Sequence, residues 1–291
     1  MAKEIKKPSA ILLVHCPDKT GLVASITEFI YKNGGNIIDL DQHVDLENEV
    51  FFMRVEWSLD GFAIKKEKIG EFFKTLIADK FGMNWEIYFS DYTPKMALFV
   101  SKLSHCLYDI LSRTQSGEWD VEIPIIVSNH PDLEEVSKTF NIDYYCFKNV
   151  KENKAEVENE QIKLLKKYGI DFIVLARYMQ ILTDNFVSHF SNKIINIHHS
   201  FLPAFAGARP YQSAYERGVK IIGATSHYVT TELDAGPIIE QDIIRVSHMD
   251  SVEDLVRKGK DLEKIVLSRA IWSHLNRNVL VYDNKTVVFN S

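Results

Sequence analysis

In the first 90 residues, segments with apolar residues at strand spacing alternate with segments that have them at helix spacing. Leu22, Ile26 and Ile30 are spaced as one face of a helix, which Gly34 would end. The predicted elements are a strand over residues 10–16, a helix over 21–33, a hairpin over 36–45 and 50–57, a helix carrying Ile69, Phe72, Phe73 and Leu76, and a strand over 84–89. This βαββαβ order predicts a ferredoxin-like domain.

From residue 95 onward, apolar runs of strand length alternate with longer helical patterns. Alternation of this kind predicts an α/β domain with a mostly parallel, Rossmann-like sheet. Residues 92–94 form a short linker, so we expect two domains, residues 1–90 and 94–291. The predicted strands cover residues 95–100, 121–127, 144–147, 172–175, 194–197, 221–229 and 238–246, the helices cover 133–140, 153–167 and 252–276, and a last hairpin covers 282–289.

Composition narrows the class of protein. The chain has 291 residues, 46% of them hydrophobic, which is enough for a sizeable core in one large or two ordinary domains. A net charge of −6 gives no indication of a nucleic-acid partner. Cys16, Cys106 and Cys146 are scattered without a CxxC pair, which favours a reducing compartment over disulfides or a cysteine zinc site. No apolar signal core follows the first charges and no run approaches about 18 apolar residues, so we expect a soluble, cytoplasmic protein with no membrane partner.

Asn196, His198 and Asp234 are the strongest candidates for chemistry. Asn196 and His198 are two apart at the end of a predicted strand, so they point to the same side, where open α/β sheets bind ligands. Asp234 lies in a tight polar loop between two further predicted strands. Taken singly, Asn196 suits a turn and Asp234 suits loop stabilisation. Together, an amide, histidines and a carboxylate suit attack on a carbonyl, which needs an oxyanion donor and a base.

The neighbouring histidines leave two interpretations open. His199 should point away from His198 and be structural, whereas His227 suits either a proton network or a strand histidine bonded to backbone. A zinc hydrolase using His198, His199, His227 or Asp234 is an alternative, because zinc favours such ligands. No HExxH or HxxxH pattern is present, so we expect no metal.

The motifs recur in a recognisable order. Asn-x-His-x-Ser-x-Leu-Pro at 196–203, Gly-x-Thr-x-His at 223–227 and Asp-x-Gly-x-Ile at 234–238 resemble the formyltransferase family that uses 10-formyltetrahydrofolate, over about residues 94–291. The resemblance implies that Asn196, His198 and Asp234 are catalytic. It also implies that residues 176–182 cradle the pterin; a strand-to-helix connection with core side chains is the alternative for this segment. The implied substrate-binding residues are Met179, Gln180, Ile181, Leu182, His227 and Gly236.

The segments that would hold a second substrate differ from those of two familiar branches of the family. The ribonucleotide transformylases carry a glycine-rich phosphate loop after the first strand, whereas residues 101–107 here contain no glycine. Residues 208–211 are Ala-Arg-Pro-Tyr in place of a transformylase-type Ala-His. About fifteen residues follow the long helix, against a large C-terminal domain in the branch that formylates tRNA.

The resemblance therefore implies water as the acceptor. Formate and tetrahydrofolate would be the products of 10-formyltetrahydrofolate, with no separate cofactor, and the formate would supply purine synthesis and balance one-carbon units. A formyltransferase with an unidentified amine acceptor is the alternative.

Two N-terminal segments resemble an ACT domain, a small regulatory module: residues 16–24, Cys-Pro-Asp-Lys-Thr-Gly-Leu-Val-Ala, and residues 33–36, Asn-Gly-Gly-Asn. The resemblance implies a homo-oligomer and an amino-acid effector, with glycine or methionine as candidates, bound where two ACT units meet. We expect Asp18 to cap the first helix. Dimerisation alone is the alternative for this module, and an amino-acid or folate sensor without catalysis is the alternative for the chain. The implied effector-binding residues are Asp18, Gly21, Asn33 and Asn36.

Overall fold

A computed structural model describes residues 7–148, 153–203 and 210–289 of this α/β protein, which divides into two compact units. Unit 1 comprises Met1–Thr93, Asn276–Leu280 and Val287–Ser291, and unit 2 comprises Pro94–Leu275 and Val281–Thr286. The chain beyond residue 275 is therefore shared between the units. Ala208 and Arg209, which belong to the segment that differs from the transformylases in sequence, lie outside the described residues. In the part of the chain that is described, no helix is both long and apolar enough to cross a bilayer.

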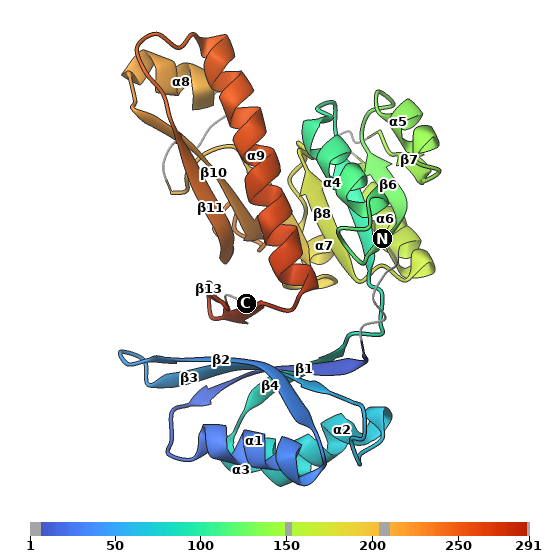
Figure 1. Cartoon of the computed structure of the whole chain (residues 1–291). Coiled ribbons are helices and arrows are strands. Elements are labelled where there is room, and N and C mark those ends of the chain that lie inside the picture. The colour runs from blue at the N-terminus through green and yellow to red at the C-terminus, as the bar shows by residue number, and fades with distance from the viewer. Residues whose placement is uncertain (1–6, 149–152, 204–209, 290–291) are drawn as a thin grey trace. The chain divides into compact units, whose positions relative to one another are not determined.

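Unit 1 has the predicted ferredoxin-like order. Its four strands, β1 (Ser9–Pro17), β2 (Asn36–Asp45), β3 (Val50–Ser58) and β4 (Asn84–Phe89), form an antiparallel sheet in the order β2-β3-β1-β4. The helices α1 (Leu22–Lys32), α2 (Lys66–Phe73) and α3 (Asp79–Phe81) lie on one face of this sheet (Figure 1). The core between sheet and helices includes Leu12, Val14, Ile26, Ile30, Met53, Trp57, Ile69 and Phe73.

The predicted cap of α1 is wrong. No side chain caps this helix, and it begins instead from Gly21, whose left-handed backbone (φ 92°) favours glycine. The backbone N–H of Asp18 donates to the carbonyl of Glu49 at 2.7 Å. Asp18 is thereby held to the hairpin, with its side chain in solvent.

The second helical segment buries fewer of its apolar residues than its spacing predicts. Ile69 and Phe73, one turn apart, are buried, but Phe72 is 46% exposed and Leu76 is 55% exposed. A π turn over Lys74–Ala78 follows α2 and changes the residue spacing, so the predicted face does not continue through residue 76.

The sheet of unit 2 is mostly parallel, as predicted. Its strand order is β11-β10-β9-β8-β5-β6-β7, and the five strands from β5 to β9 run parallel. At one side, β10 pairs antiparallel with β9, and β11 pairs antiparallel with β10. The strands are β5 (Lys95–Val100), β6 (Glu122–Ser128), β7 (Asp143–Cys146), β8 (Phe172–Ala176), β9 (Ile194–His198), β10 (Ile221–Tyr228) and β11 (Ile238–Arg245).

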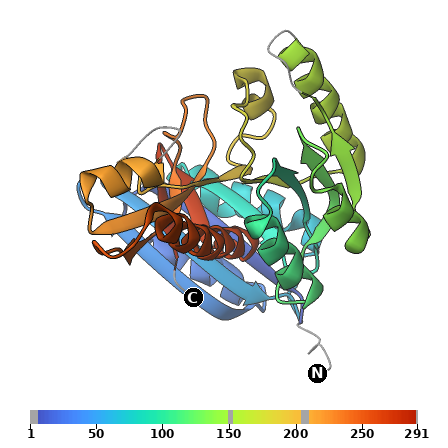
Figure 2. The same ribbon diagram turned by 90° about the horizontal axis from the view of Figure 1, so that it is seen from above.

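Three helices of unit 2, α4, α7 and α8, were not predicted. The most consequential is α4, which begins directly after the loop of β5 and buries Cys106, Leu107, Ile110 and Leu111. The long α9 lies along β9, β10 and β11 and beside α4 (Figures 1 and 2). The helices are α4 (His105–Gln115), α5 (Glu134–Thr139), α6 (Lys154–Tyr168), α7 (Asp184–Ser188), α8 (Pro210–Arg217) and α9 (Val252–Leu275). The last two strands, β12 (Val279–Tyr282) and β13 (Lys285–Val288), form the predicted hairpin, with an earlier start.

Candidate active site

The register of the sheet brings three polar side chains together. Asn196 and His198 are two apart on β9, so they share a face of the strand. His227 on β10 is the partner of Asn196 in the antiparallel ladder. As a result, Asn196 Nδ2 lies 3.2 Å from His227 Nε2.

Asp234 joins this group from the loop after β10. Its Oδ2 lies 3.2 Å from His198 Nδ1, and its Oδ1 lies 3.6 Å from His227 Nε2. The Asp234 side chain is 25% exposed, whereas that of His227 is 2% exposed. The structure thus places one partly exposed carboxylate between two buried imidazoles.

The backbone of the 234–236 loop is held close to β10. Asp234 has a left-handed backbone (φ 54°), which aspartate tolerates better than most residues do. A Cβ on Gly236 would lie 1.8 Å from the carbonyl oxygen of Tyr228, so only glycine fits there. The Tyr228 N–H also donates to the carbonyl of Pro237 at 2.9 Å. The close approach of Gly236 to Tyr228 therefore sets the position of Asp234 relative to β10.

Electrostatics keep the carboxylate ionised. Hydrogen bonds from His198 and then His227 outweigh partial burial and hold the pKa of Asp234 well below its usual range. His198 Nδ1 faces this carboxylate, while its Nε2 is buried and has no hydrogen-bond partner among the described residues. A buried imidazole nitrogen without a partner suits contact with a ligand.

His227 also orients the Asn196 amide. Its Nδ1 lies 2.9 Å from the carbonyl oxygen of Tyr228. Because a carbonyl only accepts, Nδ1 carries a proton, while Nε2 lies 3.2 Å from Asn196 Nδ2 and 3.6 Å from Asp234 Oδ1. His227 thus holds the Asn196 amide beside the Asp234 carboxylate.

Thr225 supports the turn that follows β9, a role that sequence analysis did not assign. Its fully buried Oγ1 donates to the carbonyl of Ser200 at 2.9 Å and accepts from the Leu202 N–H at 3.0 Å. Gln241 Nε2 donates to the same oxygen at 2.9 Å and to the Leu202 carbonyl at 3.1 Å. The sequence signal for this role is the position of Thr225 within the Gly-x-Thr-x-His motif.

The segment after β8 separates into exposed and buried residues. Met179 is 58% exposed and Ile181 is 61% exposed, whereas Leu182 is only 9% exposed and packs in the core of unit 2. Gln180 Nε2 donates to the Met179 carbonyl at 2.9 Å, and the Met179 N–H donates to Ser101 Oγ at 3.0 Å. Two apolar side chains are therefore presented outward on a backbone anchored to the loop after β5.

His199 does not point away from His198, as alternation along a strand predicted. The two rings stack with centroids 5.2 Å apart and planes 28° apart. Strand β9 ends at His198, so the alternation of strand side chains no longer applies to the next residue. Burial, and then the charges of Arg177 and His198, lower the pKa of His199 to about 4.

The four effector-binding candidates are not brought together within one chain. Asp18 and Gly21 precede α1, whereas Asn33 and Asn36 follow it. Eleven helical residues separate the two pairs by about 16 Å. Asn33 is already used, because its Nδ2 donates to the carbonyl of Phe29 at 2.7 Å at the end of the helix.

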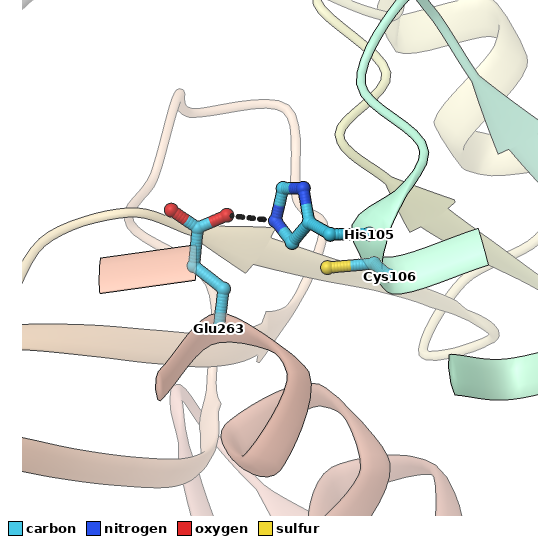
Figure 3. A group of neighbouring side chains, drawn as sticks. All are labelled: His105, Cys106 and Glu263. Carbon is cyan, nitrogen blue, oxygen red and sulfur yellow. Dashed lines mark hydrogen bonds and ion pairs between the residues drawn. The ribbon is translucent and has the colours of Figure 1, made fainter. Parts of the chain in front are cut away.

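A second polar group in unit 2 was missed by sequence analysis. Figure 3 shows His105 and Cys106 of α4 directed toward Glu263 of α9. His105 Nε2 lies 2.7 Å from Glu263 Oε2, and one ligand atom from each of the three residues lies within 4.8 Å of the others. The two helices are 158 residues apart at this contact, so no local pattern could have indicated it.

Comparisons with known proteins agree with this architecture. A family model described as formyl transferase matches residues 94–271, and an ACT domain model matches residues 10–60. A formyltetrahydrofolate deformylase of Synechocystis sp. is 57% identical over 281 residues, which cover 97% of this chain and 98% of that protein. The chain belongs to the formyltetrahydrofolate deformylase family.

Further relatives carry the same description. The Bacillus subtilis formyltetrahydrofolate deformylase is 49% identical, with 96% of this chain and 93% of that protein covered. The crystal structure of a formyltetrahydrofolate deformylase from Pseudomonas syringae has a TM-score of 0.95 at 44% identity, covering 99% of this chain and 96% of that one. Both predicted resemblances, to the formyltransferase family and to the ACT domain, are confirmed.

Proposed function

We propose that this protein hydrolyses 10-formyltetrahydrofolate to formate and tetrahydrofolate. Family membership supports the substrate, and one observation carries the mechanism: His198 has Nδ1 within 3.2 Å of the Asp234 carboxylate and a buried, unpartnered Nε2 among the described residues. A ring held in this way presents one nitrogen to a reacting group.

Asn196 and His198 are the proposed oxyanion donors. Water attacks the formyl carbon, and negative charge develops on the formyl oxygen. His198 donates from Nε2, and Asn196 donates from its amide Nδ2, which lies 3.2 Å from His227 Nε2. Donors placed before the reaction stabilise the developing charge without reorganisation.

Asp234 is the proposed acceptor for the proton of the attacking water. The low pKa of Asp234 keeps it ionised at neutral pH, so it orients water by accepting a hydrogen bond. The proton of that water becomes acidic as the C–O bond forms, and a carboxylate then suffices to accept it. The C–N10 bond breaks as this proton passes to N10, and the second water proton leaves when formic acid ionises to formate.

The segment after β8 is the proposed pterin site. Met179 and Ile181 are exposed apolar side chains that suit a planar ring, and Gln180 offers an amide beside them. Leu182 supports the loop from the core. The proposed role of Gly236 is to place Asp234, since a Cβ at that position would meet backbone at 1.8 Å.

The test is to incubate the full-length protein with 10-formyltetrahydrofolate and no second substrate, and to measure formate. We expect formate from the wild type, and a loss of at least roughly 10²–10³ in rate for His198→Ala. A parallel reaction with glycinamide ribonucleotide should yield no formylated nucleotide. Efficient formylation of that nucleotide without formate release would contradict the hydrolysis.

We also propose that the ACT unit binds a small amino acid in a homo-oligomer. Asp18 and Asn36 are exposed at opposite ends of α1, so a shared site requires two copies of the chain. Calorimetry and kinetics with glycine and methionine, on the wild type and on Asp18→Ala and Asn36→Ala, test this. Point variants are preferable to truncation, because Asn276–Leu280 belongs to the same unit. Absence of binding by the wild type contradicts these effectors, and light scattering tests the oligomer.

A further inference from the structure

The sheet of unit 2 has a topological switch point between β5 and β8. The chain adds β6 and β7 on one side of β5 and then returns to add β8 on the other side. In open α/β sheets, ligands bind in the crevice beyond the carboxyl ends of the strands at such a point. The residues that follow β5 and β8 here include His105, at the start of α4, and Arg177, directly after β8.

At this position the polar side chains bind one another. Glu263 of α9 is 1% exposed, and both of its carboxylate oxygens are occupied. Oε2 contacts His105 Nε2 at 2.7 Å and lies 3.5 Å from Arg177 Nε, while Oε1 accepts from the Tyr211 hydroxyl at 2.7 Å. These four residues, His105, Arg177, Tyr211 and Glu263, are called the switch-point cluster below.

The backbone of α9 is adapted to this contact. Gly259 lies one turn before Glu263, and a Cβ there would lie 2.1 Å from the Tyr211 hydroxyl oxygen. Glycine in a helix interior costs about 0.5–1 kcal/mol relative to alanine. Its presence allows the Tyr211 ring to lie against the helix, which places the phenol on the carboxylate.

These residues are poorly suited to binding a metal ion. His105, Cys106 and Glu263 do lie within ligating distance of one another, but the Glu263 oxygens already accept from an imidazole and a phenol. The Arg177 guanidinium beside Oε2 would repel a cation. Burial raises the pKa of the Cys106 thiol, which disfavours the thiolate that zinc requires. The Glu263 carboxylate is therefore satisfied by hydrogen bonds to His105 and Tyr211, with Arg177 beside it as an ion-pair partner at 3.5 Å.

The cluster continues to the proposed catalytic centre through aromatic rings. The Tyr211 and His199 ring centroids are 6.1 Å apart, and those of His199 and His198 are 5.2 Å apart. His198 is the proposed oxyanion donor. The rings of Tyr211, His199 and His198 therefore form a continuous row from the switch point to the proposed position of the formyl group.

We infer that the switch-point cluster occupies the subsite that a second substrate would need and thereby restricts the formyl acceptor to water. This inference rests on the proposed hydrolysis. The carboxylate, imidazole, guanidinium and phenol are groups that could hold a polar acceptor, but the carboxylate already holds the imidazole and the phenol by hydrogen bonds and the guanidinium by an ion pair. A water molecule needs no such subsite, whereas an amine must displace part of the cluster to bring its nitrogen to the formyl carbon.

The experiment measures how the formyl group divides between water and a small primary amine, glycinamide. In the transfer reaction the amine nitrogen forms a bond to the formyl carbon, the C–N10 bond breaks, and the amine proton passes to N10. Tyr211→Ala and His105→Ala each remove a ring of the cluster from a different helix. Tyr211→Phe is the matched control, because it loses only the hydroxyl and keeps the ring. Formate and N-formylglycinamide are quantified together, with the reaction lacking protein subtracted.

We expect formate as the main product, with a low and equal fraction of N-formylglycinamide, from the wild type and from Tyr211→Phe. In the two alanine variants we expect the ratio of N-formylglycinamide to formate to rise at least about tenfold, the scale on which pocket shape discriminates between substrates. Thermal unfolding identifies a variant that fails to fold, and the other alanine variant then provides the test. An unchanged ratio in a folded, hydrolysing alanine variant overturns the inference. Failure of the wild type to release formate contradicts the proposed hydrolysis instead, so the two outcomes are distinguishable.

Discussion

Asp234→Asn is the sharpest test of the proposed centre, because it changes charge with little change in shape. The Asp234 carboxylate lies 3.2 Å from His198 Nδ1 and 3.6 Å from His227 Nε2. Asparagine retains one oxygen that can accept from an imidazole N–H. It removes the negative charge beside His198 Nδ1, and it removes the proposed proton acceptor for water.

The expected magnitude follows from these two losses. A hydrogen bond to a charged group contributes about 1.5–3 kcal/mol, and one between neutral groups contributes about 0.5–1.5 kcal/mol. The substitution replaces the first kind by the second at His198 Nδ1, which costs about 1–2 kcal/mol. Loss of a positioned base contributes a further factor of roughly 10²–10⁴. We therefore expect kcat for formate release to fall at least about a hundredfold.

The assay is steady-state formate release, with binding of tetrahydrofolate measured separately by calorimetry. Because the lost interactions are made in the transition state, kcat and kcat/KM should fall together while binding persists. Asp242→Asn is the matched control: Asp242 pairs with Arg269 at 2.9 Å on the surface of unit 2, where such pairs contribute about 0–1 kcal/mol. That variant should retain wild-type activity.

The reasoning is refuted if Asp234→Asn folds, binds tetrahydrofolate and releases formate at a rate near that of the wild type. Loss of tetrahydrofolate binding with little loss of kcat would also contradict it, because Asp234 would then be a binding residue. A melting temperature close to that of Asp242→Asn shows that the loss of rate does not come from unfolding.

Three further outcomes are expected. Gly236→Ala should abolish formate release even where the chain folds, because its Cβ would lie 1.8 Å from the Tyr228 carbonyl and must displace Asp234; full activity in this variant contradicts that packing. The His199 pKa of about 4 lies below the unfolded value of about 6.5, so the unfolded chain binds more protons between these values and stability falls as pH is lowered through this window. Denaturant unfolding across pH should show a shallower loss there for His199→Gln. Gln161 is fully buried, and neither side-chain polar atom has a partner among the described residues, so Gln161→Met should raise the free energy of unfolding by about 1–3 kcal/mol; a decrease would indicate a missed partner.

Local patterns in the sequence were sufficient for most elements and for both folds. Strand β4 (Asn84–Phe89) and strand β5 (Lys95–Val100) have the predicted bounds, because their apolar runs are short and end at polar or turn residues. The alternation of such runs with helical patterns predicted the parallel sheet of unit 2. The helix that was missed after β5 carried a usable signal in Leu107, Ile110 and Leu111, which are spaced as one helical face.

Errors arose where the backbone departed from a regular repeat. Asp18 was expected to cap α1, but a left-handed Gly21 starts that helix. His199 was expected to oppose His198, but β9 ends between them. The spacing of apolar residues predicts side-chain directions inside a helix or strand, but it does not predict them at the residue where that element ends.

Motif spacing and hydrophobic period are local properties of the chain, and they were enough to predict the two fold classes, the family, and Asn196, His198 and Asp234 as candidates. How those candidates meet depends on the packing of the folded chain. The ladder of β9 and β10 sets Asn196 beside His227, and the close approach at Gly236 sets Asp234 beside His198. The contact of His105 with Glu263 joins α4 to α9 across 158 residues. Such distances depend on how complete elements pack, and no spacing within a single element encodes them.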